Sequence, residues 1–308
     1  MLDVIIIFIV SFAILAKASE YVIDSAIDIT KILGVSEFAT GFLLLSVATS
    51  IPELFVSATA SLTGNSGIAI GNVIGANIAD IAWVLGATAI VGLVTFTKKR
   101  AAKNAAILFL VSLIPLVLMT KGVLSSTDGL VLLLIFFIYC FFVSKTEFVG
   151  TKKQAGANST LKAVAVFIIS IAVVVFSAHL IVQSGVKIAE LFNIPPVFIG
   201  LSIISIGTTL PELSVNLTAV RKKKLSLAVG NILGSCVTNL TLVLGTAAVI
   251  NPIEIETVIP ISSILFLIAL NLFLWFNVRR GRLTRTSGVA MIMAYILFMA
   301  FEAGMISL

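Results

Sequence analysis

The sequence contains little charge. Only 11% of its 308 residues are Asp, Glu, Lys or Arg, and 59% are hydrophobic, whereas soluble domains carry about 25% charged residues. The hydrophobic residues form runs of about 20, the length at which an α-helix crosses a bilayer, and not the short alternating segments of an outer-membrane barrel. The composition excludes a soluble fold and predicts an all-α integral membrane protein whose main partner is the lipid bilayer.

Histidine and cysteine are also scarce. His179 is the single histidine, so a two-histidine metal motif cannot be built. Cys140 and Cys236 fall inside apolar runs, without metal-ligand spacing or a disulfide framework, and we expect both to be buried. No nucleophile–base pair is evident, which argues against an intramembrane enzyme, and we expect no cofactor. Basic cytoplasmic loops explain the net charge of +6, so we expect no nucleic-acid partner.

Ten hydrophobic spans can be drawn along the chain. We place them at residues 2–23, 37–63, 66–94, 104–120, 127–145, 161–182, 196–220, 225–250, 258–278 and 286–307. With ten spans, one side of the membrane receives almost all the basic loop residues, and the other receives only Lys121 and Lys187. Because cytoplasmic loops carry the excess of Lys and Arg, we predict a multi-pass protein of the plasma membrane with both termini extracellular.

An internal repeat organises the chain. Residues 41–86 align with residues 200–245 without a gap, and about a third of the positions are identical, several times the chance level. Each copy holds five spans, so the second copy enters the membrane from the opposite face. Inverted repeats of this kind are usual in secondary transporters, whose binding site lies near the midplane between the halves. We predict five-helix repeats at 1–145 and 161–308, joined by a cytoplasmic linker at 146–160.

Each repeat carries a glutamate directly after a proline in mid-span, as Pro52–Glu53 and Pro211–Glu212. An ionisable side chain at the centre of a bilayer costs about 2.5–3.5 kcal/mol on insertion scales. Its occurrence twice, in the same local sequence, indicates that the two glutamates act together. Proline removes a helical hydrogen bond, so we expect a bent or broken helix in which some or all carbonyls of residues 46–49 are freed.

Small residues open the span that follows each glutamate. They are Gly67, Gly71 and Gly75 in the first repeat, and Ser226, Gly230 and Gly234 in the second. Small residues four apart predict a close helix-packing face. This face would let the span approach the bent helix closely enough to share a site with it.

The same span carries further polar residues at matching positions. Asn72 and Asn231 each follow a glycine, and we expect them to cap a local break or to form hydrogen bonds between helices. Asp80 and Asn239 lie near mid-span, and we interpret Asp80 as an ion ligand or proton carrier.

The polar groups predicted at this depth are all oxygen donors: carboxylates, hydroxyls, amide oxygens and freed carbonyls. Calcium takes six to eight oxygen ligands in an adaptable shell, whereas magnesium gives up its water reluctantly. Transition metals favour nitrogen or sulfur ligands. Two carboxylates match the charge of a divalent ion, and sodium could compete for the same oxygens. The sequence therefore predicts a site for a hard cation.

The paired Pro-Glu and Gly-Asn segments resemble the two alpha-repeats of the calcium/cation antiporter superfamily, and the whole chain is most similar to a prokaryotic sodium/calcium exchanger. This resemblance implies an antiporter, not an enzyme, that exchanges calcium for sodium by alternating access. It implies calcium binding by Glu53 and Glu212, with backbone and hydroxyl oxygens of Thr49 and Thr208. It places the remaining ion ligands at or beside Ser46, Ser50, Ser205, Thr209 and Ser235, with Asp80 and Asn239 as the central polar pair.

The resemblance also implies a division of labour between the spans. The first and sixth would slide across the site to switch access, and the fourth, fifth, ninth and tenth would form a static scaffold. We expect a monomer, with calcium and sodium as transported ions.

The sequence departs from the family pattern at three places. Ala48 replaces the usual glycine of the first motif, and Ala76 stands where a serine ligand is expected, although Ser235 keeps its counterpart. The acid and amide of the central pair are exchanged, with Asp80 in the first repeat and Asn239 in the second. The exchange conserves total charge, whereas the hydroxyl missing at Ala76 puts sodium coupling in question.

Two alternatives stay open. Midplane carboxyl groups can carry protons, so Glu53, Glu212 or Asp80 could support proton/calcium exchange. A cation channel could line a pore with the same oxygens but would lack a coupled cycle; inverted repeats with broken helices favour a carrier.

Overall fold

In the computed structural model, the described residues are 2–62, 64, 66–92, 94–95, 106, 109–111, 113–114, 117–118, 120–146, 157–191, 205–254 and 261–302. Helices dominate this part of the chain, as the apolar runs predict. In the first half they are α1 (Leu2–Leu33), α2 (Glu37–Thr40), η1 (Gly41–Leu45), α3 (Ser46–Thr49), α4 (Ile51–Leu62), α5 (Ser66–Ala79), η2 (Asp80–Val84), α6 (Leu85–Val91) and α8 (Ser126–Thr146), where η marks a π-helical turn. In the second half they are α9 (Ala157–Leu191), α11 (Ser205–Thr208), α12 (Leu210–Arg221), α13 (Leu225–Thr238), η4 (Asn239–Val243), α14 (Leu244–Ile250), α15 (Ile261–Arg279) and α16 (Arg285–Glu302).

Six of the described helical segments are long and apolar enough to cross a membrane. They are Asp3–Leu33, Ala69–Val91, Ser126–Lys145, Asn158–Ser177, Leu225–Ile250 and Ser262–Arg279. The pair Glu37–Thr49 and Ile51–Leu62, bent by 44°, gives a seventh if it counts as one span, and Arg285–Phe301 is a shorter apolar helix. These segments lie at predicted spans, but the first runs to Leu33 and does not end at residue 23 as predicted. The predicted span 104–120 is described only in part, and the start of the span 196–220 lies outside the described residues.

Four two-residue strands connect the repeats, and the sequence did not predict them. β1 (Val94–Thr95) pairs antiparallel with β4 (Arg282–Leu283), and β2 (Val123–Leu124) pairs in the same way with β3 (Ile253–Glu254). In the repeat alignment β1 corresponds to β3 and β2 to β4. The pairing of β1 with β4 is therefore equivalent to that of β3 with β2, and the same contact between the repeats occurs twice. Each pairing supplies hydrogen-bond partners for backbone N–H and C=O groups beside the helix ends.

Glycines bring helices of opposite repeats into backbone contact. A Cβ on Gly86 of α6 would lie 3.1 Å from the carbonyl oxygen of Gly288 in α16. A Cβ on Gly129 of α8 would lie 2.7 Å from the carbonyl oxygen of Gly245 in α14. Gly86 aligns with Gly245, and Gly129 with Gly288, so the two contacts are equivalent. Close approach of this kind is how membrane helices gain packing energy without a hydrophobic driving force.

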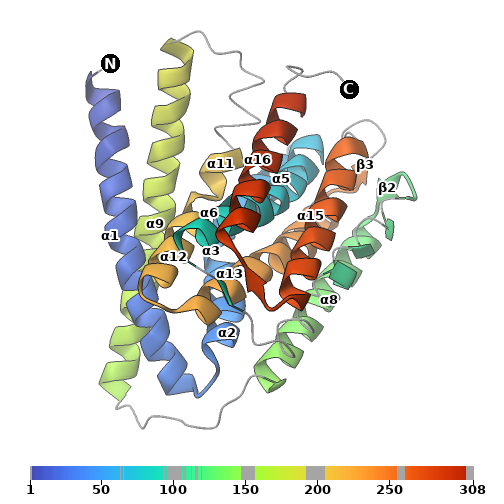
Figure 1. Cartoon of the computed structure of the whole chain (residues 1–308). Coiled ribbons are helices and arrows are strands. Elements are labelled where there is room, and N and C mark those ends of the chain that lie inside the picture. The colour runs from blue at the N-terminus through green and yellow to red at the C-terminus, as the bar shows by residue number, and fades with distance from the viewer. Residues whose placement is uncertain are drawn as a thin grey trace.

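The helices are arranged as a bundle with one separate pair. α1 and α9 run antiparallel, side by side, along one edge of the molecule (Figure 1). Their buried side chains form a hydrophobic cluster with α12, distinct from the larger cluster centred on α5, α6, α13 and α14. α1 begins and α16 ends at the same end of the molecule (Figure 1). Of the two cysteines, Cys236 is buried as predicted and Cys140 is half-buried.

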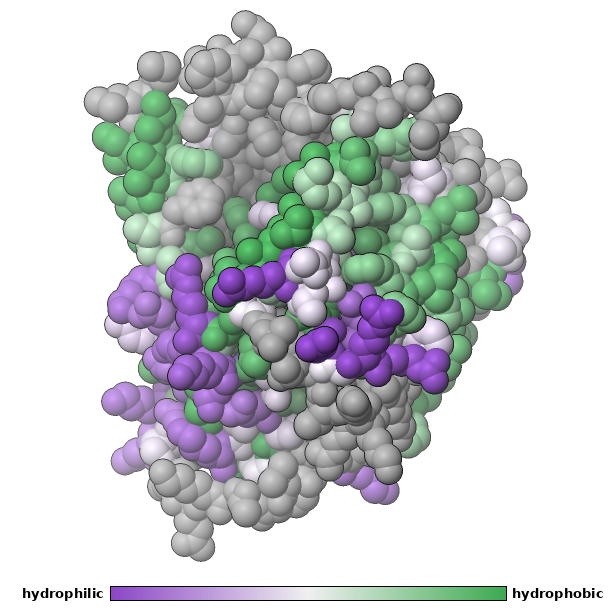
Figure 2. Space-filling view, viewed as in Figure 1, coloured by the Kyte–Doolittle hydropathy of each residue, from purple (hydrophilic) through white to green (hydrophobic). Residues whose placement is uncertain are grey.

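Hydrophilic side chains gather over the lower part of α1 and the turn between α12 and α13, and hydrophobic side chains cover the surface above them (Figure 2). Two ion pairs lie at this turn: Lys222 with Asp24 of α1 (2.6 Å) and Lys224 with Glu37 of α2 (2.7 Å). The Lys222 ammonium also donates to the carbonyl oxygen of Glu20, 3.3 Å away. The turn therefore connects α1 and α2 to the second repeat.

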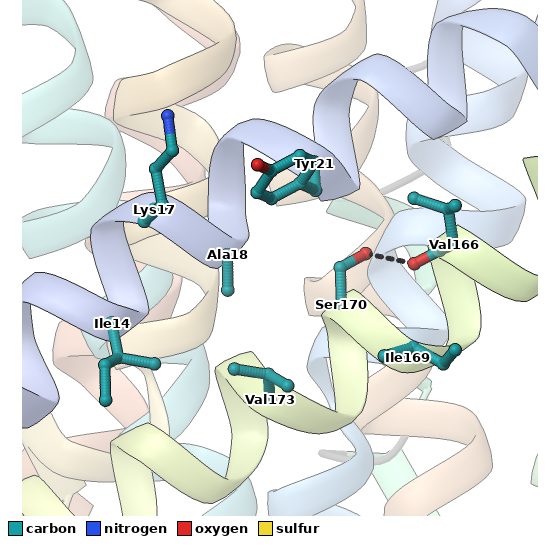
Figure 3. Close-up of a pocket in the computed structure, with 8 residues that line it drawn as sticks. All are labelled: Ile14, Lys17, Ala18, Tyr21, Val166, Ile169, Ser170 and Val173. Atoms are coloured by element: carbon teal, nitrogen blue, oxygen red, sulfur yellow. Dashed lines mark hydrogen bonds between the residues drawn. The ribbon is translucent and has the colours of Figure 1, made fainter.

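A groove of about 370 Å³ lies between α1 and α9. Figure 3 shows its lining residues: Ile14, Lys17, Ala18 and Tyr21 from α1, and Val166, Ile169, Ser170 and Val173 from α9. The lining is mostly apolar, and the Ser170 hydroxyl donates to the carbonyl oxygen of Val166 at 2.6 Å (Figure 3). None of the predicted ion ligands lines this groove.

Candidate ion-binding site

The first glutamate follows a break in the helix. α3 ends at Thr49, Ser50 has φ −81° and ψ 9°, and α4 begins at Ile51. Pro52 has no N–H group, so the carbonyl of Ala48 loses the donor that a continuous helix would supply. Of the four carbonyls in the preceding turn, that of Ser46 keeps its helical bond, since it accepts the N–H of Ser50 at 3.0 Å, so only a subset of the turn is freed.

The second repeat breaks in the same way. α11 ends at Thr208, Thr209 has φ −89° and ψ 3°, and α12 begins at Leu210 with Pro211 in its first turn. Proline is tolerated in a first turn because the N–H it lacks would have no helical partner there. The Pro-Glu motif therefore sets the start of a new helix in both repeats and places the glutamate in its first turn.

Glu53 and Glu212 are fully enclosed, with 0% and 1% of their surface exposed. None of their four carboxylate oxygens has a hydrogen-bond partner within the described residues. A hydroxyl of the opposite repeat acts on each glutamate, since Thr208 interacts with Glu53 and Thr49 with Glu212. Buried charged oxygens without partners are costly, so this arrangement indicates a place for a cation.

Asp80 is the third buried acid of the site, and its charge acts on both glutamates. It begins the π-helical turn η2, and Asn239 begins the equivalent turn η4. The Asn239 side-chain nitrogen lies 3.5 Å from Asp80 Oδ2. π-Helical turns inside α-helices are frequently found at functional sites. The structure thus brings the predicted central pair together beside the glutamates.

The other predicted ligands are buried hydroxyl groups. Ser50 and Ser235 have hydroxyls without a hydrogen-bond partner in the described structure. The Ser46 hydroxyl donates to the carbonyl oxygen of Phe42, and the Thr209 hydroxyl donates to that of Ile206. The side chain of Ser205 lies outside the described residues.

The predicted glycine face of the second repeat packs against the first repeat, whereas the face predicted for the first repeat was wrong at Gly71, where no described atom lies within 4 Å of an added Cβ. A Cβ on Gly234 would lie 2.6 Å from the Ser46 hydroxyl oxygen, and a Cβ on Gly230 would overlap the Phe38 carbonyl oxygen. Asn72 bonds between helices as expected, since its Nδ2 donates to the carbonyl oxygen of Glu53 at 3.1 Å.

The sequence reasoning missed three buried polar residues. Asn77 Oδ1, Asn216 Oδ1 and the Thr238 hydroxyl have no hydrogen-bond partner in the part of the chain that the structure describes. The repeat does not duplicate these residues, so a search for matched positions passes over them. A polar side chain within an apolar span was the available signal.

The donor set suits a hard cation. In the described residues, no three or more His, Cys, Asp or Glu side chains form a group that could hold a metal ion. An ion at this site would therefore need hydroxyl, amide and carbonyl oxygens in addition to the carboxylates, as calcium and sodium ligation allows.

Comparison with known proteins decides the family. A family model described as "Sodium/calcium exchanger protein" matches residues 4–145 and 162–303. The chain belongs to the sodium/calcium exchanger family. It is 28% identical to "Sodium/calcium exchanger MaX1" of Methanosarcina acetivorans, with 96% of this chain and 97% of that protein covered. It is 29% identical to "Inner membrane protein YrbG" of Escherichia coli, with 80% of each chain covered.

The family fold is also shown by solved structures. The sodium-calcium exchanger NCX_Mj, soaked with sodium and no calcium, superposes with a TM-score of 0.88 at 28% identity, covering 97% of this chain and 99% of that one. The same exchanger soaked with sodium and calcium gives a TM-score of 0.86. This exchanger-family member is an all-helical, multi-pass membrane protein with two family repeats, and a cation antiporter rather than an enzyme.

Proposed function

We propose that this antiporter exchanges calcium for sodium across the plasma membrane at a site built from Glu53 and Glu212. The observation that carries the proposal is the set of four enclosed carboxylate oxygens with no hydrogen-bond partner among the described residues. Two unpaired carboxylates are strongly unfavourable in a low-dielectric interior unless a counter-charge joins them. A calcium ion supplies two positive charges and accepts oxygens from both repeats.

In this proposal, Thr49 and Thr208 complete the calcium shell. Each threonine faces the glutamate of the other repeat, so a calcium ion would bridge the two halves. Sodium ions would take the surrounding positions at Ser46, Ser50, Ser205, Thr209 and Ser235, with Asp80 and Asn239 between them.

Competition for the same carboxylates provides the coupling. Three mutually repelling acids in an enclosed site make the empty carrier costly to reorient, so one ion must replace the other before access switches. We assign the movement to α1 and α9, which lie side by side at one edge of the molecule and share a hydrophobic cluster with α12. The remaining helices would hold the site, and both termini would be extracellular.

The relatives support this reading by their names. MaX1 is named a sodium/calcium exchanger, and NCX_Mj has been studied with sodium, calcium and strontium. The five-helix repeats at 1–145 and 161–308, with the linker between them, are part of the same proposal.

The test is calcium-45 uptake into proteoliposomes. Vesicles loaded with sodium should accumulate calcium when diluted into sodium-free medium, and vesicles loaded with potassium should not. Failure of the sodium gradient to drive uptake, combined with uptake driven by a proton gradient, would replace sodium by the proton as counter-ion. Uptake that follows the calcium gradient alone, without any counter-ion, would indicate a channel.

A further inference from the structure

Two aligned asparagines, Asn72 and Asn231, make different contacts in the two repeats. In the first repeat, Asn72 Nδ2 donates to the carbonyl oxygen of Glu53 (3.1 Å) and to the hydroxyl of Ser57 (2.9 Å). Asn72 therefore holds the backbone of the Pro-Glu turn from the neighbouring helix of its own repeat.

The second repeat supports its glutamate differently, because Asn216 replaces Ser57 at the aligned position. Asn216 Nδ2 donates to the carbonyl oxygen of Glu212 at 2.7 Å, within the same helix. In the second repeat Asn216 therefore donates the hydrogen bond to the glutamate carbonyl that Asn72 donates in the first. Asn231 is left free of that role, fully buried, and its Nδ2 has no hydrogen-bond partner within the described structure.

Asn231 instead reaches across to the first repeat. The Thr49 hydroxyl lies 3.5 Å from Asn231 Oδ1 and 3.5 Å from the carbonyl oxygen of Ser46, and it also interacts with the Glu212 carboxylate, the group that a bound cation would contact. The Ser46 carbonyl already accepts the N–H of Ser50 at 3.0 Å. A Cβ on Gly41 would lie 2.9 Å from the Asn231 backbone nitrogen, so α13 is held tightly against this part of the first repeat.

The proton of Thr49 is what matters chemically. A hydroxyl has one proton and two lone pairs, and it can give lone pairs to a cation only if the proton points elsewhere. Residues that form hydrogen bonds with a metal ligand, without touching the metal, orient that ligand and affect the affinity for the ion. We propose that Asn231 is a positioning residue for calcium: its Oδ1 accepts the Thr49 proton and turns the hydroxyl lone pairs toward the ion. This inference rests on the proposed calcium site at Glu53 and Glu212.

The experiment measures calcium affinity at equilibrium in purified protein, with calcium-45. Asn231→Leu keeps the side-chain size but removes the acceptor, and we expect calcium affinity to fall about tenfold, as for other groups behind metal ligands. Once Thr49→Val has removed the hydroxyl, Asn231→Leu should cause no further loss. The control is Asn72→Leu, because Asn72 has no described hydrogen bond to Thr49. The factor by which Asn72→Leu lowers calcium affinity should multiply with the factor for Thr49→Val.

A second variant leaves Asn231 intact. Asn216→Ser recreates the first repeat's arrangement, so Asn231 can turn to the Glu212 carbonyl as Asn72 turns to that of Glu53. We expect calcium affinity to fall here as well. This variant keeps the test valid should Asn231→Leu lower the melting temperature of the ion-free protein.

The outcomes separate the two proposals. Wild-type protein that binds no calcium would overturn the proposed function itself. Wild-type binding that is unchanged by both Asn231→Leu and Asn216→Ser, or losses from Asn231→Leu and Thr49→Val that simply multiply, would overturn only the role of Asn231.

Discussion

The side-chain nitrogen of Asn239 lies 3.5 Å from a carboxylate oxygen of Asp80, a residue 159 positions away in the chain. The two residues are equivalent in the repeat alignment, and each begins a π-helical turn. One member of the pair carries a charge and the other does not. The third acid of the site therefore belongs to this pair, and which repeat supplies it follows from the sequence rather than from the geometry.

We therefore expect the charge to be movable within the pair. Asp80→Asn alone removes one of three acids, and calcium exchange should fall about tenfold, equivalent to about 1.4 kcal/mol. The double variant Asp80→Asn with Asn239→Asp restores the total charge and should recover most of the activity. Calcium-45 exchange in proteoliposomes measures both. No recovery in the double variant would show that the acid must lie in the first repeat.

The glutamates should not tolerate loss of charge. Glu53→Gln or Glu212→Gln leaves one carboxylate facing a divalent ion, and because removing one partner of a buried pair costs about 3–5 kcal/mol, sodium-driven calcium uptake should fall at least about a hundredfold. Glu254→Gln is the matched control, since Glu254 is exposed on β3 and its variant should keep normal exchange. Near-normal uptake in either site variant would refute the central role of the pair.

Ala76 gives a test of sodium binding in the opposite direction. Ala76 is buried, with 1% exposed, at the position aligned with Ser235. Ala76→Ser would add the missing hydroxyl, and the sodium concentration for half-maximal exchange should fall several-fold, whereas the unpaired hydroxyl should destabilise the ion-free protein by about 1–3 kcal/mol.

Ala69→Ser is the control for that change. Ala69 is equally buried and lies two turns away on the same helix face, so its variant should lose stability without any gain in sodium affinity. Equal sodium dependence of Ala76→Ser and wild type would mean that no sodium ion binds at this position.

The packing of α13 against the first repeat gives a prediction about stability. Gly230→Ala would drive a methyl group into the Phe38 carbonyl, and overpacking of this kind costs about 1–3 kcal/mol. Gly71 is the aligned glycine of the first repeat, and no described atom lies within 4 Å of a Cβ placed there. Melting temperatures in detergent should fall for Gly230→Ala and stay close to wild type for Gly71→Ala; equal losses would contradict this difference.

Much of the fold could be predicted because a bilayer imposes strict rules on a sequence. Apolar runs of sufficient length must be helices, since the backbone has to satisfy its own hydrogen bonds in lipid. The aligned Pro52 and Pro211 therefore located both helix breaks, and Asp80 with Asn239 located the central pair. Which carbonyls of the broken turn lose their helical partner was left open by the sequence, and the structure shows that the Ser46 carbonyl keeps its helical bond.

Other features depended on contacts between distant segments. The pairings of β1 with β4 and of β2 with β3 involve two residues a strand, too few to leave a periodic signal in the sequence. Asn216 and Asn231 are both polar residues in membrane helices, and although only Asn231 has an aligned asparagine, the sequence does not show which groups either one contacts. Only their partners, the Glu212 carbonyl and the Thr49 hydroxyl, separate a residue that supports the backbone from one that faces the site.

The sequence by itself determined the membrane setting, the duplication with its inverted sense, and the two acids that follow the helix breaks, because each follows from composition and from repetition along the chain. The tertiary structure alone decided which groups meet: the threonine of each repeat facing the glutamate of the other, and the asymmetric use of the aligned asparagines. Contacts across the repeat interface depend on how the two halves pack against each other, and one pattern written twice in a chain can pack into two different environments.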